Sequence, residues 1–107
     1  MSQNKRNTTE LNSAQSVIGE TELKILVELK EVNGIVEIRW EIDHRYPIPK
    51  MKGEIQALGI NEVYECSINA HIGAANSHFP WGNDYVGSLW GWNGEKYILI
   101  VQTPITS

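Results

Sequence analysis

The sequence has little of the chemistry that marks a secreted or membrane protein. Its 107 residues include one cysteine, Cys66, so no intramolecular disulfide can form and a disulfide-rich secreted scaffold is excluded. The longest apolar run, at 97–101, is far shorter than a membrane span. The first 20 residues contain no apolar stretch of the length that a signal peptide needs. These absences predict a cytoplasmic protein.

Basic residues are scarce as well. Lysine and arginine number 9 and aspartate and glutamate number 13, which gives a formal net charge of -4. A nucleic-acid binder of this size normally has a basic excess, because neutralising phosphates supplies much of its affinity. We therefore expect no nucleic-acid partner, and we expect no membrane partner.

The chain also lacks the short motifs of phosphate binding, paired-cysteine chemistry, zinc proteases and serine hydrolases. We accordingly expect no cofactor and no metal. Residues 1–20 are rich in Asn, Ser, Thr and Gln without any period, which predicts a flexible N-terminal tail with a weak helical turn at 14–18. Residues 21–107 are expected to form a single β-rich domain.

The strongest structural signal is a hairpin over residues 23–43. The dipeptide Asn33-Gly34 suits a two-residue turn in which both central residues have positive φ. Folding about it pairs residues whose numbers sum to 67. One face then receives three apolar pairs, and the other receives three pairs of opposite charge. The apolar pairs are Leu29 with Ile38, Val27 with Trp40, and Ile25 with Ile42; the charged pairs are Lys30 with Glu37, Glu28 with Arg39, and Lys24 with Asp43.

A second hairpin is predicted over residues 84–103, about Asn93-Gly94. The same turn geometry pairs Trp90 with Tyr97 and Leu89 with Ile98. Both faces of this hairpin are largely apolar, which indicates that it is covered on two sides. Because a domain of this size has few residues to supply such a cover, the pattern also predicts a homo-oligomer.

The middle of the chain is more ambiguous. Residues 63–72 alternate as a half-buried strand with Ile72 facing inward. Residues 51–58 fit a strand that pairs Ile55 with Cys66, or a helix at about 49–58. Residues 73–83 predict a long loop. The fold expected is therefore all-β, an antiparallel meander of about six strands in three hairpins, built as a small barrel or sandwich; the alternative is an α+β fold with one helix.

Two groups of residues are candidates for a binding site. Aromatic residues are dense between 79 and 97, and Trp81, Tyr85 and Trp92 are the ones we expect to line a ligand pocket. His71 and His78 could join them from the neighbouring segment. The ordinary alternative is that the aromatic residues are core, that the histidines are surface residues, and that Cys66 is a buried, inert thiol.

The sequence favours a small binding or inhibitory protein that acts through protein–protein contact. A binder of a small apolar or planar molecule, or of a glycan, in an aromatic-lined pocket is the alternative. An enzyme with an unrecognised site, built from the histidines, Asp84 or the glutamates, is the least favoured hypothesis.

Overall fold

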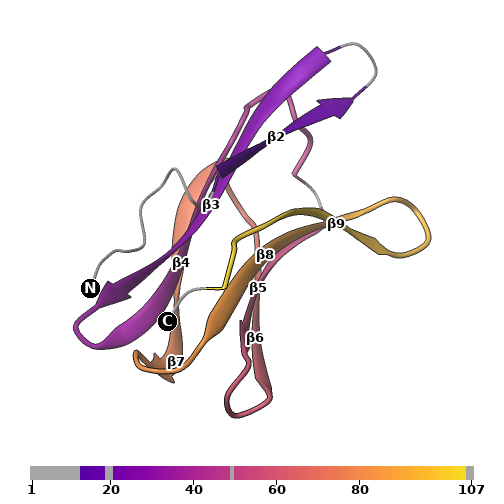
Figure 1. The fold of residues 1–107 in the computed structure, drawn as a ribbon. Helices are drawn as coiled ribbons and strands as arrows, with labels where there is room; N and C mark the ends of the chain where they lie inside the picture. Colours follow the sequence, from indigo (N-terminus) through magenta and orange to yellow (C-terminus); the bar gives the residue numbers. More distant parts are fainter. Residues whose placement is uncertain (1–12, 19–20, 49, 106–107) are drawn as a thin grey trace.

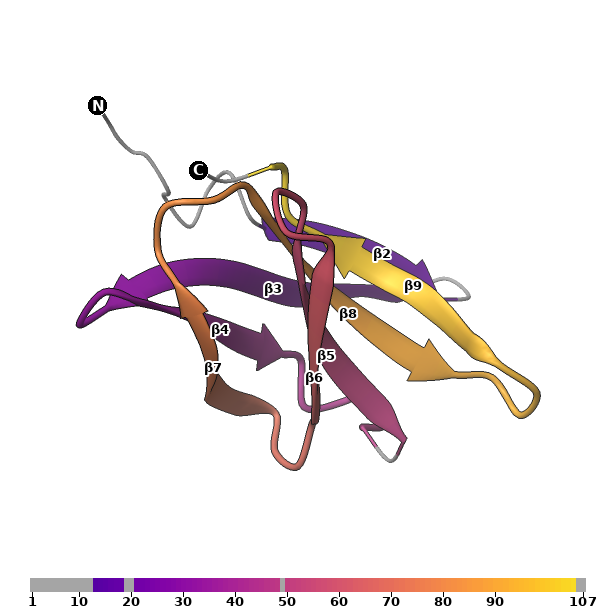
Figure 2. The same cartoon turned by 90° about the horizontal axis from the view of Figure 1, so that it is seen from below.

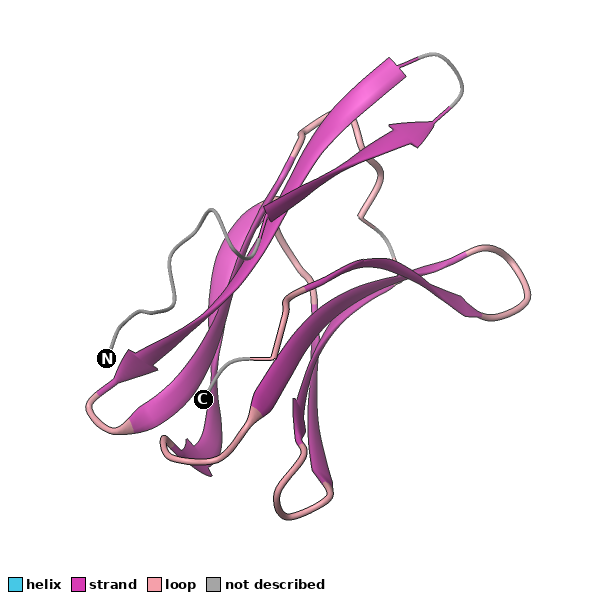
Figure 3. Ribbon diagram, in the orientation of Figure 1, coloured by secondary structure: helices cyan, strands magenta, loops and turns pink. Residues whose placement is uncertain are grey.

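The computed structural model describes residues 13–18, 21–48 and 50–105. All regular elements among them are strands (Figure 1). They are, in chain order, β2 (Ser13–Ile18), β3 (Thr21–Val32), β4 (Ile35–Ile42), β5 (Met51–Ala57), β6 (Glu62–Ser67), β7 (Ile72–Pro80), β8 (Tyr85–Trp92) and β9 (Tyr97–Gln102). Figure 3 shows no helix in this part of the chain. The all-β class is thus confirmed, and the alternative helix at 49–58 is wrong.

The strands form two four-stranded antiparallel sheets that pack as a sandwich (Figure 2). Sheet I has the order β2-β3-β4-β7, and sheet II has the order β6-β5-β8-β9. The chain crosses between the sheets after β4, after β6 and after β7, as is common in Greek-key sandwiches. The sandwich is confirmed, but the order of strands is not a simple meander, because β4 pairs with β7 and β5 pairs with β8.

The β3–β4 hairpin has the predicted register. Val27 pairs with Trp40, Leu29 with Ile38 and Glu28 with Arg39. Asn33 and Gly34 both have positive φ, 54° and 81°, as the two-residue turn requires. The apolar pairs are buried, so this hairpin supplies the inner face of sheet I.

The register predicted for the β8–β9 hairpin is wrong by two residues. Tyr97 pairs with Trp92 instead of Trp90, and Ile98 pairs with Gly91 instead of Leu89. A bulge between Leu89 and Trp90 then shifts the remaining pairs further. The cause is the turn: the Asn93 side chain accepts hydrogen bonds from the backbone N–H groups of residues 95 and 96, which moves the turn toward residues 94–95.

The middle hairpin is a strand pair, but it too is displaced by two residues. Ile55 pairs with Tyr64, not with Cys66, because the turn occupies residues 58–61 and Asn61 has a φ of 57°. The strand expected over 63–72 ends at Ser67, and Ile72, expected inside, has 72% of its surface exposed. The chain leaves sheet II between these points in order to reach sheet I.

The long loop predicted at 73–83 is largely strand β7. Its glycine, alanine, asparagine and serine residues have low strand propensity, but β7 pairs with β4, and Ser77 and Phe79 in its second half are buried. The Ser77 hydroxyl donates to the carbonyl of Val36 at 2.7 Å and accepts from the amide of Phe79 at 3.1 Å. This network satisfies a polar side chain that would otherwise be costly to bury.

The predicted N-terminal tail falls mostly on residues 1–12 and 19–20, which lie outside the described residues. Residues 13–18 form β2, which pairs antiparallel with β3. The helical turn predicted at 14–18 is therefore wrong. Within the described part of the chain, no helix has the length and apolar character that a membrane crossing requires.

One apolar core lies between the sheets. Sheet I contributes its alternate residues from β3 and β4, and sheet II contributes Met51, Ile55, Tyr85 and Leu89. Tyr85 is fully buried, and its hydroxyl donates a hydrogen bond to the carbonyl of Pro80 at the crossing into β8. A buried tyrosine at the start of a strand, with its hydroxyl hydrogen-bonded to the backbone a few residues upstream, recurs in Greek-key sandwiches.

Candidate functional site

The five residues predicted to line a ligand pocket do not come together. Trp81 lies between β7 and β8, Tyr85 is the first residue of β8 with its ring centroid 6.2 Å from that of Trp81, and Trp92 is the last residue of β8. Seven residues of extended chain place Tyr85 and Trp92 about 23 Å apart. Tyr85 also stacks on Phe79, with a centroid distance of 5.9 Å, and has no exposed surface for a ligand.

The two histidines are likewise separated. His71 lies just before β7, where its Nε2 atom is 2.9 Å from the carbonyl oxygen of Tyr46. His78 lies seven residues further along, near the other end of β7, and is exposed. An extended strand of that length spans about 23 Å. Among the described residues there is no group of three His, Cys, Asp or Glu side chains that could hold a metal ion.

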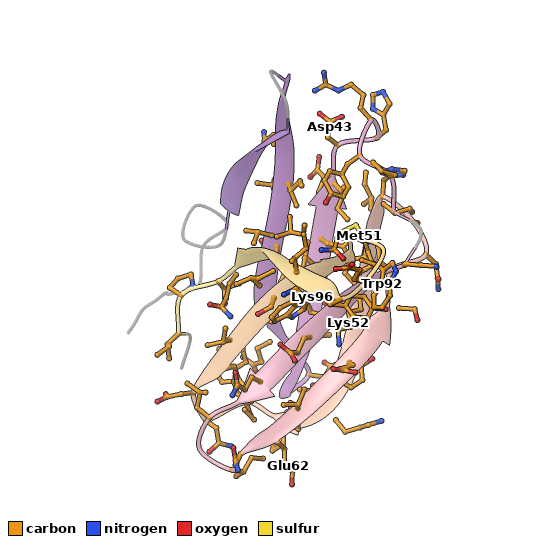
Figure 4. The ribbon with its side chains drawn as sticks, turned by 90° about the vertical axis from the view of Figure 1, so that its right-hand side faces the viewer. Asp43, Met51, Lys52, Glu62, Trp92 and Lys96 are labelled. Carbon is orange, nitrogen blue, oxygen red and sulfur yellow. The ribbon has the colours of Figure 1, made fainter. Side chains whose placement is uncertain are left out.

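Trp92 belongs instead to a cluster at the far end of sheet II. Its ring meets that of Tyr97 edge to face, with centroids 5.1 Å apart. The Lys50 ammonium lies 6.0 Å from the centroid of Trp92, and that of Lys52 lies 4.5 Å from the centroid of Tyr97. Figure 4 shows Lys52, Trp92 and Lys96 at this end of the sheet, with Glu62 at the opposite end.

Lys52 is held in place from two sides. Its ammonium group donates to Glu65 at 2.9 Å while it faces the Tyr97 ring, and the hydrogen bond raises the pKa of the Lys52 ammonium. The neighbouring Trp90 donates its indole N–H to Glu54 at 3.1 Å. Beside Trp92 and Tyr97, the outer face of sheet II therefore carries both positive and negative side chains. The ammonium groups of Lys50 and Lys52 already face these two aromatic rings.

The feature that most distinguishes this end of the molecule is the exposure of β9. Tyr97, Ile98 and Leu99 expose 37%, 42% and 45% of their surface, and Trp92 exposes 39%. We call these four residues the apolar edge patch. β9 is the last strand of sheet II, and the loop before it projects from the body of the molecule (Figure 1). The site prediction did not include Tyr97, Ile98 and Leu99, although the apolar faces of this hairpin were the signal for them.

A second group of exposed apolar residues surrounds the β5–β6 turn, at Leu58, Ile60 and Val63. Two of these lie in the turn itself, where side chains project singly. The adjoining strand β6 carries Glu62 and Glu65, and charged residues on an edge strand oppose pairing with another chain. This group is therefore a weaker candidate for a contact surface than the apolar edge patch.

A shallow cleft of about 270 Å³ lies on sheet I. Leu26, Glu28, Arg39 and Glu41, which point away from the core, and the exposed Ile72 contribute to its lining. Arg39 is paired with Glu37 at 2.8 Å. Trp40 and Gly73 also line the cleft, and the Trp40 indole N–H is fixed by a hydrogen bond of 3.0 Å to the carbonyl of Ala70.

Cys66 is half-buried and packs against the core. Burial raises the pKa of its thiol, which lowers the fraction of reactive thiolate at neutral pH. This environment is that of a structural cysteine and not of a nucleophile.

The fold defines this chain as a small antiparallel β-sandwich domain with an exposed apolar edge. Comparison of the chain with protein-family models, with curated proteins and with solved structures finds no match.

Proposed function

We propose that this chain is a protein-binding domain whose contact surface is the edge of sheet II at β9, which pairs on that side with no other strand among the described residues. One observation carries the proposal: the consecutive residues Tyr97, Ile98 and Leu99 are all exposed on a strand at the end of its sheet. Because neighbours in a strand point to opposite faces, these side chains present apolar surface on both sides of β9. A strand of that kind is suited to a partner that covers its edge and both its faces.

The area of the apolar edge patch is ordinary, but its position on an edge strand is unusual. Four large side chains that are each about 40% exposed present roughly 300 Å² of surface, which a monomeric protein tolerates. Unpaired strand edges are a different matter, because their free N–H and C=O groups pair with other chains unless charge or proline protects them. Residues 97–101 contain neither. Partners that add an extended segment to such an edge gain backbone hydrogen bonds as well as side-chain contacts.

Photo-crosslinking in cells that naturally contain the protein tests this proposal. The crosslinking residue p-benzoylphenylalanine is placed in the full chain at Leu99 or, as a matched control, at Val63 on the opposite edge of the same sheet. Position 99 is expected to give an adduct of discrete mass, and position 63 is expected to give little. The proposal is rejected when position 99 gives no adduct or when both positions give the same pattern.

A second candidate function, the binding of a small molecule, is favoured by the cleft on sheet I. Its volume of about 270 Å³ is just below the range of roughly 300–1,000 Å³ for such sites. Saturable quenching of tryptophan fluorescence by a member of a small-molecule panel, abolished by Ile72→Lys, would support it. A panel without any saturable response argues against it.

A further inference from the structure

We infer that the partner of the β9 edge is a second copy of this chain, joined by antiparallel pairing of β9 with β9. The inference rests on the proposed function, because it names the partner of the same edge. Pairing across a two-fold axis at Leu99 extends sheet II of one copy into sheet II of the other. The result is a continuous eight-stranded sheet made of two sheets of four.

The side chains of β9 are complementary to themselves in this register. Residues that face each other across an antiparallel pair project to the same face. With Leu99 opposite Leu99, Ile98 of each copy lies opposite Ile100 of the other. Leu99 pairs with Trp90 on the outer face of sheet II, whereas Ile98 and Ile100 lie on the inner side, where Ile98 pairs with Gly91 and Ile100 lies against it. Each of the three central pairs is therefore apolar: the Leu99 pair lies on the outer face, and the two Ile98–Ile100 pairs lie on the inner face.

The lack of charged residues distinguishes the β9 edge from the edges at β6 and β7 on the opposite side of the sandwich. Across a two-fold axis a residue on the axis meets its own copy, and each other residue meets the one equally far beyond the axis, so like charges near the axis disfavour the pairing. β6 carries Glu62 and Glu65, and β7 ends in a proline. β9 carries no charge, and neither does β2, which is in contact with β9 on the same side of the molecule. Two copies that meet there bring no like charges of the edge strands together.

The exposed area indicates how strong this dimer is. Stable interfaces bury about 800 Å² from each partner, and the apolar edge patch presents roughly 300 Å² of side-chain surface. Six residues of β9 add backbone hydrogen bonds, but these only replace bonds to water. We therefore expect a weak, reversible dimer whose population rises with concentration over a range from about 10 μM to about 500 μM.

Analytical ultracentrifugation of the full chain over that range tests the inference. Leu99→Lys and Leu99→Glu each set like charges opposite one another at the axis, and each is expected to weaken dimerisation about tenfold or more. An equimolar mixture of the two variants sets lysine opposite glutamate and is expected to restore a heterodimer that weakens with added salt. Val63→Lys, on the other edge of sheet II, is expected to leave dimerisation unchanged.

Leu99 is 45% exposed, so these changes are expected to leave the thermal unfolding of the monomer near that of the wild type. Where Leu99→Lys alters it, Leu99→Thr replaces it, because threonine keeps strand propensity while removing the apolar contact. A wild-type chain that is monomeric throughout the range overturns the inference, and so does a dimer that Val63→Lys disrupts or that the mixture does not restore. A monomeric chain that still crosslinks from position 99 to a different protein overturns the inference that the partner is a second copy, and it leaves the proposed function standing.

Discussion

The contact between Trp40 and Gly73 gives a sharp test of how sheet I is packed. A Cβ atom on residue 73 would lie 2.7 Å from Cζ2 and 2.9 Å from Cε2 of the Trp40 ring. The indole has little room to retreat, since its N–H is bonded to Ala70 and the side chain is 7% exposed. Gly73→Ala therefore forces either the ring or strand β7 to move.

The cost can be worked from two opposing effects. Overpacking of this kind destabilises by about 1–3 kcal/mol. The φ of Gly73 lies outside the left-handed region, so alanine recovers about 0.4–1 kcal/mol by restricting the unfolded chain. With each effect near the middle of its range, the net loss in the free energy of unfolding is expected to be about 1–2 kcal/mol. For a domain of this size that lowers the thermal midpoint by roughly 4–16 °C.

Urea denaturation with a double-mutant cycle measures this effect. Trp40→Phe removes the part of the ring that faces residue 73, so Gly73→Ala is expected to cost less in that background than in the wild type, with a coupling of about 0.5–3 kcal/mol. Gly91→Ala is the matched control, because the nearest atom to its Cβ is the methyl end of Ile100 at 3.2 Å. A loss below about 0.5 kcal/mol for Gly73→Ala, or no coupling to Trp40→Phe, refutes the packing argument.

Three further measurements probe other contacts. Hydrogen bonds from Arg45 hold the pKa of the Asp43 carboxyl well below its usual value, so these bonds stabilise the fold at neutral pH and their contribution is lost as the pH falls toward the lowered pKa. The melting temperatures of the wild type and Asp43→Asn should therefore converge on acidification from about pH 5 to about pH 2. A difference that stays constant over this range would contradict the argument. Burial raises the pKa of Cys66, so iodoacetamide should alkylate the folded chain more slowly than the urea-unfolded chain at pH 8, as followed by mass spectrometry; equal rates would show that the thiol is accessible. Tyr85→Phe removes the hydrogen bond to Pro80 and should cost about 0.5–1.5 kcal/mol in chemical denaturation, where an unchanged midpoint would mean that the bond contributes nothing.

The two Asn-Gly dipeptides show where prediction from this sequence succeeds and where it fails. Asn33 and Gly34 both adopt positive φ, so the turn chemistry sets the register and every pair follows. At the second dipeptide only Gly94 does so, because the Asn93 side chain caps the following amides instead. Both uses of asparagine are favourable, and the sequence does not distinguish them. Between the turn and the bulge the displacement is two residues, which keeps each side chain on its face; beyond the bulge it is three, and Val101 moves to the inner face beside Leu89.

The loop prediction for residues 73–83 is wrong, and the five candidate pocket residues are separated, for a common reason, which is tertiary context. Nothing local in residues 72–80 favours a strand, and the segment is extended because β4 offers it a partner and the core accepts Ser77 and Phe79. The pocket assumed that aromatic residues close in sequence are close in space. An extended strand separates them, which leaves Trp81 with the core aromatics and Trp92 with Tyr97.

The long excursion between β4 and its second partner has a consequence for biosynthesis. The β3–β4 hairpin can form once residue 42 has left the ribosome, but the other side of β4 stays open until residues 72–80 have been made. Such non-local pairing is slow to form. In the nascent chain, β4 is therefore a temporary open edge rich in isoleucine, valine and tryptophan. That edge closes when β7 docks, whereas the outer edge of β9 is paired with no other strand among the described residues.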